Sequence, residues 1–222
     1  MPQITIFLGG YGSGKSELSI AAALAAAQHE PTSLIDLDII NPAFRSTEQR
    51  RTLEAGGVAL YSPTFSGTTL DLPALPARIQ GVLQSPGRVL VDVGGDPDGA
   101  GALGRYHDCL AAGYQALFVI NARRPLQQNL ADLLHLYHGI TARARVVPTG
   151  LINNTNLALQ TTPQDVLDGQ TIAEALSRNT GVPIVGIHGL PHVLDALPRE
   201  FIRQHQAILQ PLTPRMRPDW LA

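Results

Sequence analysis

The octapeptide GGYGSGKS occupies residues 9–16 and matches the pattern G-x-x-x-x-G-K-[ST] at every fixed position. It comes directly after the apolar run ITIFL at residues 4–8 and just before an alanine-rich stretch at residues 18–27. A strand, a glycine-rich loop and a helix in this order are the context that the pattern requires. We therefore predict that residues 9–16 form a phosphate-binding loop, called the phosphate loop below.

Each part of the phosphate loop has its own role in binding a nucleoside triphosphate. The glycines let backbone amides turn inward, Lys15 reaches the terminal phosphates, and the Ser16 hydroxyl coordinates Mg²⁺. The positive end of the following helix favours bound anions. We expect Lys15 to stabilise developing charge during catalysis. The predicted nucleotide contacts in this loop are Gly9, Gly10, Tyr11, Gly12, Ser13, Gly14, Lys15 and Ser16.

Two other interpretations of this segment are weaker. A glycine-rich turn could match the pattern by chance, but the flanking strand and helix count against chance. The dinucleotide pattern G-x-G-x-x-G fails, because a match starting at Gly10 or Gly12 would need glycine where Lys15 and Glu17 stand. The predicted ligand is a triphosphate and not NAD.

The composition fits one α/β domain. The chain has 222 residues, of which 44% are hydrophobic, enough to cover both faces of a sheet. We predict that residues 1–210 form this nucleotide-binding domain and that residues 211–222 form a proline-rich tail.

Charge and cysteine content narrow the setting in which the protein works. The formal net charge of −2 gives no strong signal for nucleic-acid binding. The one cysteine, Cys109, excludes an internal disulfide and fits a reducing compartment. No signal-like segment precedes the phosphate loop, and no run approaches the roughly 20 apolar residues of a membrane span. We expect a cytoplasmic protein without a membrane span.

Short aliphatic runs alternate with longer stretches of helical character. The runs lie at residues 4–8, 33–36, 58–61, 89–92, 116–120, 146–152 and 184–187, and the helical stretches at 17–29, 72–84, 100–112, 126–144, 164–179 and 191–209. Near-continuous apolarity is typical of buried parallel strands. The alternation predicts a doubly wound α/β fold, with a mostly parallel sheet and helices on both faces.

An aspartate and two glycines follow the predicted strand at residues 89–92. Ligands of parallel α/β sheets gather at the carboxyl ends of strands, so Asp92 is predicted to hold Mg²⁺ directly or through water. Gly95 is expected to let a backbone amide approach the γ-phosphate. The alternative is that Asp92 only caps the next turn.

Two further aspartates, Asp36 and Asp38, stand at the end of the predicted strand 33–36. An aspartate near the γ-phosphate orients or deprotonates the attacking water, and we assign this role to Asp38. We assign Asp36 to support of the metal. The alternative is an Asx turn, in which the side chain only hydrogen-bonds nearby backbone.

Asparagines follow the late predicted strand, in the segment LINNTN at residues 151–156. A guanine-reading N-K-x-D motif ends in aspartate, which accepts from both N1–H and the amino group of guanine. The corresponding position here is Asn156, with only one acceptor oxygen, so adenine is the better prediction. Asn153 is the expected base contact, although turn geometry alone also selects asparagine.

With these motifs the chain resembles the MinD/ParA/CobQ/CobB group of P-loop ATPases, and most closely the uncharacterised bacterial ATP-binding proteins within it. The resemblance covers most of the chain. It implies an ATP-binding, often dimerising switch in which Asp38 orients water and Asn153 contacts adenine. Its carriers are GGYGSGKS at 9–16, DLDIINPAFRS at 36–46, LVDVGGDPDGAGALGRY at 90–106 and LINNTN at 151–156.

One departure from that group concerns a second lysine. MinD and ParA proteins carry G-K-G-G-x-G-K-[ST], in which the first lysine reaches the partner's phosphates across a dimer. The matching position here is Gly10. Any further cation would therefore be an arginine, with Arg45 and Arg105 as the candidates and an ordinary surface arginine as the alternative for each.

The leading hypothesis is a Mg²⁺-dependent ATPase that acts as a nucleotide-dependent switch for an unknown protein or small-molecule client. A homodimer is a candidate state. Two alternatives stay open. One is a small-molecule kinase or ATP-dependent ligase that uses Asp71 or Asp96 near its substrate. The other is a nucleotide-gated binding module or metallochaperone with negligible turnover, against which the lack of a cysteine or histidine cluster counts.

Overall fold

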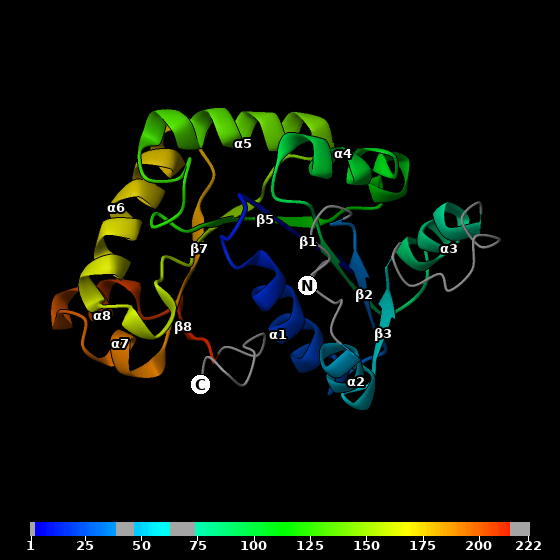
Figure 1. Cartoon of the computed structure of the whole chain (residues 1–222), viewed down its shortest axis with the longest axis horizontal. Coiled ribbons are helices and arrows are strands. Elements are labelled where there is room, and N and C mark those ends of the chain that lie inside the picture. Colours follow the sequence, from blue (N-terminus) through cyan, green and yellow to red (C-terminus); the bar gives the residue numbers. More distant parts are fainter. Residues whose placement is uncertain (1–2, 39–46, 63–73, 214–222) are drawn as a thin grey trace.

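The structure is a computed structural model that describes residues 3–38, 47–62 and 74–213. Strands and helices alternate along the chain, and helices pack on both sides of a central sheet (Figure 1). The strands are β1 (Ile4–Gly9), β2 (Thr32–Asp36), β3 (Val58–Tyr61), β4 (Arg88–Asp92), β5 (Gln115–Ile120), β6 (Gly150–Asn153), β7 (Ile184–Gly189) and β8 (Leu209–Pro211). The helices are α1 (Lys15–Ala27), α2 (Thr47–Ala55), α3 (Ala74–Leu83), α4 (Pro97–Gly104), α5 (Leu130–Ala144), α6 (Pro163–Thr180), α7 (Pro191–Asp195) and α8 (Arg199–His205), with short 3-10 helices η2 (His107–Leu110) and η3 (Ala158–Gln160).

The described strands form one sheet of eight parallel strands in the order β3-β2-β4-β1-β5-β6-β7-β8. Strand β1 lies inside the sheet between β4 and β5. The chain passes from β1 to β2 on one side and, after β4, returns to β5 on the other side, so the strand order reverses beside β1. This confirms the predicted doubly wound fold. Such a reversal opens a crevice at the carboxyl ends of the strands, which is where ligands bind in sheets of this type.

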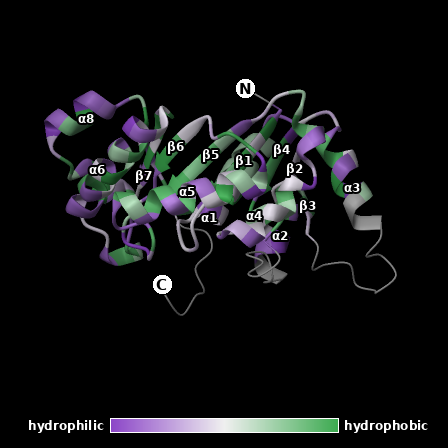
Figure 2. Ribbon diagram, turned by 90° about the horizontal axis from the view of Figure 1, so that it is seen from above, coloured by the Kyte–Doolittle hydropathy of each residue, from purple (hydrophilic) through white to green (hydrophobic). Residues whose placement is uncertain are grey.

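Both faces of the sheet are buried, which explains why its strands are apolar at consecutive positions. Ile4, Ile6 and Leu8 of β1 pack with α3, α4 and α5 on one face. The intervening Phe7 packs with α1 and α2 on the other face. Successive side chains of a strand point to opposite faces of the sheet. A sheet with helices on both faces therefore needs apolar residues at consecutive positions. Figure 2 shows the strands largely in the hydrophobic colour, whereas helices such as α6 and α8 at one end of the sheet carry hydrophilic stretches.

Helix α2 is not predicted from the sequence. Its sequence, TEQRRTLEA, has no apolar stripe of helical period, and this stripe is the main signal for an amphipathic helix. Leu53 of α2 is buried against the cluster that contains α1. Arg50 and Glu54 form an ion pair one turn apart, with a distance of 2.8 Å, which gives the helix local support.

Proline shortens or divides two predicted elements. The helix predicted over residues 191–209 is two short helices and a strand, with Pro198 at the start of the second helix. Proline has no amide hydrogen and disfavours helical geometry in the residue before it. The strand predicted over residues 146–152 begins only at Gly150, after Pro148.

Both ends of α6 are set by residues that commonly cap helices. Thr162 caps α6: its hydroxyl accepts from the Asp165 amide, and the Asp165 carboxylate accepts from the Thr162 amide. Gly181 follows the same helix in the left-handed conformation, with φ 72°.

Strand β8 crosses the predicted boundary at residues 210 and 211, so the first residues of the predicted tail belong to the sheet. Residues 214–222 lie outside the described part of the chain. None of the helices in the described ranges is long and apolar enough to cross a membrane.

Candidate functional site

The phosphate loop joins β1 to α1 at the carboxyl edge of the sheet, beside the reversal of strand order. The Ser13 amide donates to the Gly10 carbonyl oxygen at 3.1 Å, which closes a turn inside the loop. Gly12 and Gly14 have φ angles of 71° and 89°. Only glycine adopts this left-handed region without strain, so the sequence permits the inward curl of backbone that surrounds a phosphate.

The N-terminus of α1 is open toward the loop. Gly14 is its N-cap, and no side chain caps the helix. The Leu18 amide closes the first turn by donating to the Gly14 carbonyl oxygen at 3.1 Å. The first amides of a helix have no partner within the helix, and together with the helix dipole they favour a bound anion.

Lys15 is the first residue of α1 and the only lysine in the sequence. It is 5% exposed and makes no ion pair with any described residue. Its charge nevertheless lowers the pKa of both Asp36 and Asp92, so all three groups lie in one electrostatic neighbourhood. The ammonium is thus placed at the loop without a carboxylate bound to it.

Asp36 and Asp92 end the neighbouring strands β2 and β4 and are paired in register. Both are fully buried. Burial and, to a smaller extent, the charge of Asp92 raise the pKa of Asp36 to about 8, against the lowering effect of the hydrogen bond from the Asp38 amide. Burial also raises the pKa of Asp92, to about 6, although Lys15 and Ser16 act to lower it. Two buried carboxylates on adjacent strands therefore oppose each other's ionisation.

Three of the four carboxylate oxygens of these aspartates lack hydrogen-bond partners in the part of the chain that the structure describes. Both carboxylate oxygens of Asp92 and the Oδ2 atom of Asp36 accept no complete hydrogen bond within the described residues. The Ser16 hydroxyl lies close enough to Asp92 to lower its pKa, but the two groups do not have the geometry of a hydrogen bond. Buried carboxylates are normally satisfied, so these oxygens call for a ligand.

Mg²⁺ fits this donor set. It prefers oxygen ligands and is commonly held by one or two carboxylates together with substrate phosphates. The described residues contain no group of three or more histidine, cysteine, aspartate or glutamate side chains that could hold a metal ion. The phosphates of a nucleotide would therefore have to supply the remaining ligands.

Asp38 lies just beyond β2 and is buried, with 6% of its surface exposed. Its amide donates to the Oδ1 atom of Asp36 at 2.9 Å, so the Asx turn foreseen as an alternative is present. The turn uses only Oδ1 of Asp36 and leaves Oδ2 unpartnered. The charge of Asp38 raises the pKa of Asp36 and Asp92, which places Asp38 close to both.

Gly95 and Gly10 are in tight contact with their surroundings. A Cβ atom on Gly95 would lie 2.8 Å from the Tyr11 amide nitrogen, so the segment after β4 contacts the phosphate loop directly. A Cβ atom on Gly10 would lie 2.6 Å from the Nε2 atom of Gln127. A lysine at position 10, as in MinD and ParA proteins, would displace Gln127. Asp96 caps α4 by accepting from the Gly99 amide at 2.8 Å.

Asn153, the predicted base contact, is bonded to other parts of the protein in this structure. Asn153 is fully buried, its Nδ2 donates to the Val166 carbonyl oxygen at 3.0 Å, and its Oδ1 accepts from the Thr155 amide at 3.1 Å. These bonds tie the end of β6 to α6. The prediction used only the position after a strand, which does not show whether the side chain turns into the protein or into the crevice.

Asn154 binds the phosphate loop instead. Its Nδ2 donates to the Ser13 carbonyl oxygen at 2.8 Å, and a Cβ atom on Gly14 would collide with the same Nδ2. The half-buried Asn156 follows, with its Nδ2 donating to the Asn154 carbonyl oxygen at 2.7 Å and its Oδ1 accepting from the Ala158 amide at 3.2 Å. The segment after β6 therefore offers amides and no carboxylate.

The loop between β5 and α5 is part of the site, and sequence reasoning missed it. Asn121 is fully buried and exchanges two hydrogen bonds with the Asn156 backbone, at 3.1 and 3.3 Å. The Oε1 atom of Gln127 accepts from the Asn121 amide at 3.0 Å, and its Nε2 donates to the Tyr11 carbonyl oxygen at 3.5 Å. A signal was available, because Asn121 directly follows the apolar run 116–120 just as the two aspartates follow theirs.

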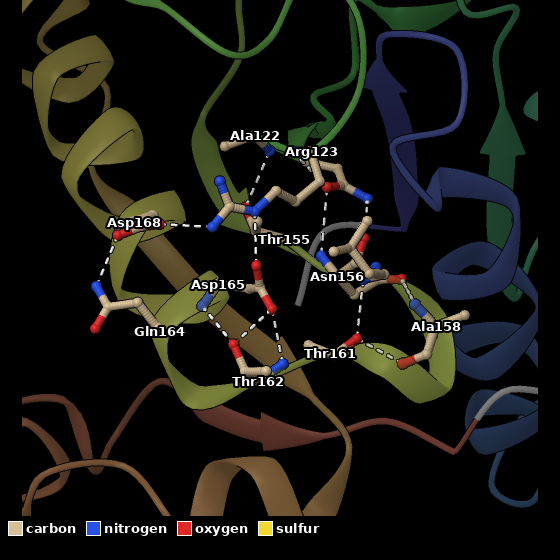
Figure 3. A network of polar contacts seen from close by, with 12 residues as sticks. Ala122, Arg123, Thr155, Asn156, Ala158, Thr161, Thr162, Gln164, Asp165 and Asp168 are labelled. Atoms are coloured by element: carbon tan, nitrogen blue, oxygen red, sulfur yellow. Dashed lines mark hydrogen bonds and ion pairs between the residues drawn. The ribbon is translucent and has the colours of Figure 1, made fainter.

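Arg123 in the same loop holds α6 (Figure 3). Its Nε donates to Asp165 and its Nη2 to Asp168, both at 2.6 Å. A cavity of about 500 Å³ opens beside this pair, and none of its lining residues belongs to the phosphate loop. The lining residues are Ala122, Arg123, Gln128, Asp168, Thr171 and Ile172.

Of the predicted accessory residues, Arg45 and Asp71 lie outside the described part of the chain. Arg105 is exposed and follows the C-terminal end of α4. Helix α4 has 8 residues, so it carries the chain about 12 Å away from the segment that contacts the phosphate loop. Arg105 therefore stands apart from the loop in this structure.

Comparison with known proteins bears on the fold. No family profile and no curated protein matches the chain. The cell division protein FtsY from Thermotoga maritima is similar in structure, with 20% identity, a TM-score of 0.55, and coverage of 85% of this chain and 62% of that one. The signal recognition particle 54 kDa protein from Aeropyrum pernix K1, in complex with GDP, has 19% identity, a TM-score of 0.54, and coverage of 84% and 41%. FlhF complexed with GMPPNP and Mg²⁺ has 18% identity, a TM-score of 0.51, and coverage of 91% and 73%.

These structures correct part of the expected resemblance. They are FtsY, signal recognition particle and FlhF proteins, so membership of the MinD/ParA group is not supported. The motifs that carried the resemblance, a phosphate loop and aspartates after neighbouring strands, are common to P-loop proteins of several groups. The agreement extends over most of the parallel sheet and its helices, and this chain has the fold of a P-loop NTPase.

Proposed function

We propose that this protein binds a nucleoside triphosphate together with Mg²⁺, hydrolyses it and acts as a nucleotide-dependent switch. The observation that carries the proposal is the pair of buried carboxylates, Asp36 and Asp92, with unpartnered oxygens beside Lys15. A buried pair of like charges is unfavourable for folding by itself. A divalent cation and the phosphates it binds would relieve that charge, so the arrangement fits function better than stability.

Each residue near the loop has one proposed role. The loop amides and Lys15 hold the phosphates, while the Ser16 hydroxyl and the Asp92 carboxylate are ligands of Mg²⁺, supported by Asp36. When bound, Mg²⁺ neutralises negative charge that develops on the phosphates. Asp38, buried next to Asp36, orients the attacking water or accepts its proton.

The proposed switch runs through the segment after β4. Gly95 contacts the Tyr11 amide, and Asp96 caps α4 in the same segment. Helix α4 in turn packs against α5 along one face of the sheet. Loss of the terminal phosphate would change the Gly95 contact and thereby the placement of α4, as happens when a phosphate-bound segment is released in other nucleotide switches.

We propose ATP as the nucleotide. The segment after β6 contains the amides of Asn154 and Asn156 and no carboxylate, whereas reading both N1–H and the amino group of guanine takes a carboxylate. Two of the similar structures contain GDP or GMPPNP, so GTP is the competitor against which ATP must be measured.

The single lysine of the chain makes a direct test possible. An acyl phosphate of ATP or GTP transfers its acyl group to an amine that is held beside the terminal phosphates. Mass spectrometry should then find the label on Lys15, with faster labelling by the ATP reagent and protection by excess Mg²⁺-ATP. Labelling of the N-terminal amine alone, or labelling that excess nucleotide does not prevent, would contradict the proposed site.

Calorimetry with two pairs of variants completes the test. Lys15→Ala should abolish binding of Mg²⁺-ATP, whereas Arg143→Met, which removes an exposed cation on α5, should leave it unchanged. Asp92→Asn should remove the dependence of binding on Mg²⁺, and the control Asp98→Asn changes an exposed carboxylate on α4. An unchanged ATP affinity in Lys15→Ala would sink the proposal.

A further inference from the structure

Arg124, in the loop between β5 and α5, lies across the phosphate loop. A Cβ atom added to Gly12 would lie 3.2 Å from both the Cδ and the Nε atoms of Arg124. The neighbouring Arg123 points to α6 and is held there by two aspartates. Adjacent arginines of one loop thus serve two different sides of the site, and the second of them covers Gly12.

Among the residues that the structure describes, none is a partner of the Arg124 guanidinium. Its Nε atom is buried and makes no hydrogen bond, and the side chain forms no ion pair within the described residues. A buried charged donor without an acceptor is unfavourable, because it has lost water and gained nothing in exchange. The place of this donor, against a loop built for phosphates, suggests that the missing acceptor is an anion held by that loop.

The loop that carries Arg124 is held in place. The Arg124 amide donates to the Asn121 carbonyl oxygen at 3.0 Å, and the Gln127 amide donates to the Arg124 carbonyl oxygen at 3.2 Å. The Gln127 side chain in turn bonds both Asn121 and the Tyr11 carbonyl oxygen. Leu126 has a φ of 62°, an uncommon backbone conformation for a residue with a side chain. Such strain persists only where surrounding contacts enforce it, and here they fix the start of the Arg124 side chain.

We propose that Arg124 donates to the terminal phosphates of the bound nucleotide, from within the same chain. The inference rests on the proposed function. Arg124 covers the Gly12 end of the phosphate loop, and Gly95, which follows Asp92, contacts the adjoining Tyr11. Ser16 and Asp92 would hold Mg²⁺, whose charge would act on the terminal phosphates, so the side approached by the Asp92 segment would be the side of the terminal phosphates. Arg124 then supplies the second cation that the loop lacks at Gly10.

The test compares triphosphate and diphosphate binding in three variants. Arg124→Met keeps the unbranched stem that packs over Gly12 and removes the charge, Arg124→Lys keeps a charge without the planar fork, and Arg143→Met changes an exposed arginine of α5. The probes are the β,γ-imido triphosphate analogues and the diphosphates of adenosine and guanosine, titrated by calorimetry with Mg²⁺. Thermal unfolding without nucleotide shows whether each variant is intact.

Arg124→Met should weaken triphosphate binding by roughly 10-fold or more, the loss expected for a charge-assisted hydrogen bond. Its diphosphate affinity should change less, so the preference for triphosphate falls. Arg124→Lys should lie between Arg124→Met and the wild type, and Arg143→Met should match the wild type. All should unfold at nearly the wild-type temperature without nucleotide.

Three results would overturn this role for Arg124. They are an unchanged triphosphate affinity in Arg124→Met, an equal loss for triphosphate and diphosphate, and an equal loss in Arg143→Met. Each leaves the proposed function standing as long as the wild type binds nucleotide through Lys15. A wild-type protein that binds neither triphosphate would overturn the proposed function, and this inference with it.

Discussion

Asp36 and Asp92 are register partners on adjacent parallel strands, both fully buried, and neither has a cation bound to it by an ion pair within the described residues. Lys15 influences both from the start of α1. The arrangement concentrates negative charge where two strands end beside the phosphate loop. Its consequences for stability can be measured before any nucleotide is added.

In Mg²⁺-free buffer with a chelator, the free energy of unfolding should fall as the pH rises from about 5 to 8. The pKa is about 8 for Asp36 and about 6 for Asp92 in the folded protein, against 3.8 for an ordinary aspartate. Between these values the folded state holds protons that the unfolded state has released, so stability is greatest at low pH and is lost as the pH rises. Urea unfolding at several pH values measures the slope.

Asp36→Asn should flatten this slope, because the amide has no charge to bury. The exposed Asp98 provides the matched control, and Asp98→Asn should keep the wild-type slope. Ionisation also prepares the site for metal, so Mg²⁺ with nucleotide should stabilise the wild type more at pH 8 than at pH 6. A slope that Asp36→Asn leaves intact would show that other groups cause it.

Asn154→Ala should weaken nucleotide binding by roughly 10-fold, since it removes a buried hydrogen bond and leaves the Ser13 carbonyl oxygen without its donor. The fold should survive, because Asn154 contributes its side chain to the loop and not to an apolar cluster. Asn179→Ala is the control, since Asn179 is an exposed residue of α6 whose amide bonds its own helix. Calorimetry and thermal unfolding together separate a loosened phosphate loop from general instability, and unchanged affinity would contradict a positioning role.

Asp165→Asn should lower the free energy of unfolding by about 2 kcal/mol, because it disrupts both the capping box of α6 and the ion pair with Arg123. The Asp165 side chain is 8% exposed. Asp168→Asn removes the other partner of the same arginine at a site that is 42% exposed, and it should cost less than about 0.5 kcal/mol. Urea unfolding measures the loss of stability in each variant. Equal losses would contradict the prediction that the more buried aspartate contributes more to stability.

Much of this site is readable from the sequence because its parts are local. The phosphate loop is contiguous, and its flanking strand and helix confirm its context within a few residues. Asp36 and Asp92 are recognisable because each ends an apolar run, and parallel strands bring such ends to one edge. The fold follows from the same alternation, which misses α2, because this helix has no periodic apolar residues, and misplaces element boundaries near Pro148 and Pro198.

The remainder depends on contacts between distant segments. The sequence places Asn153 and Asn154 side by side after β6, yet one turns into the protein and the other reaches Ser13. Which residue does which follows from the packing of α6 against the sheet. Arg124 likewise belongs to no recognisable sequence motif. Its place against Gly12 follows from the turn between β5 and α5. Pattern rules do not contain such tertiary information.

The contact between Asn154 and Ser13 joins residues 141 positions apart, and this has a consequence for synthesis on the ribosome. The phosphate loop is among the first segments to be made, but β4, β5 and the anchor after β6 are made much later. At a synthesis rate of about 5–20 residues per second, Asn154 is made on the order of ten seconds after the phosphate loop. Until residue 154 has been made, the Ser13 carbonyl oxygen lacks this donor, so we expect nucleotide to stabilise the nascent chain in full only after that point.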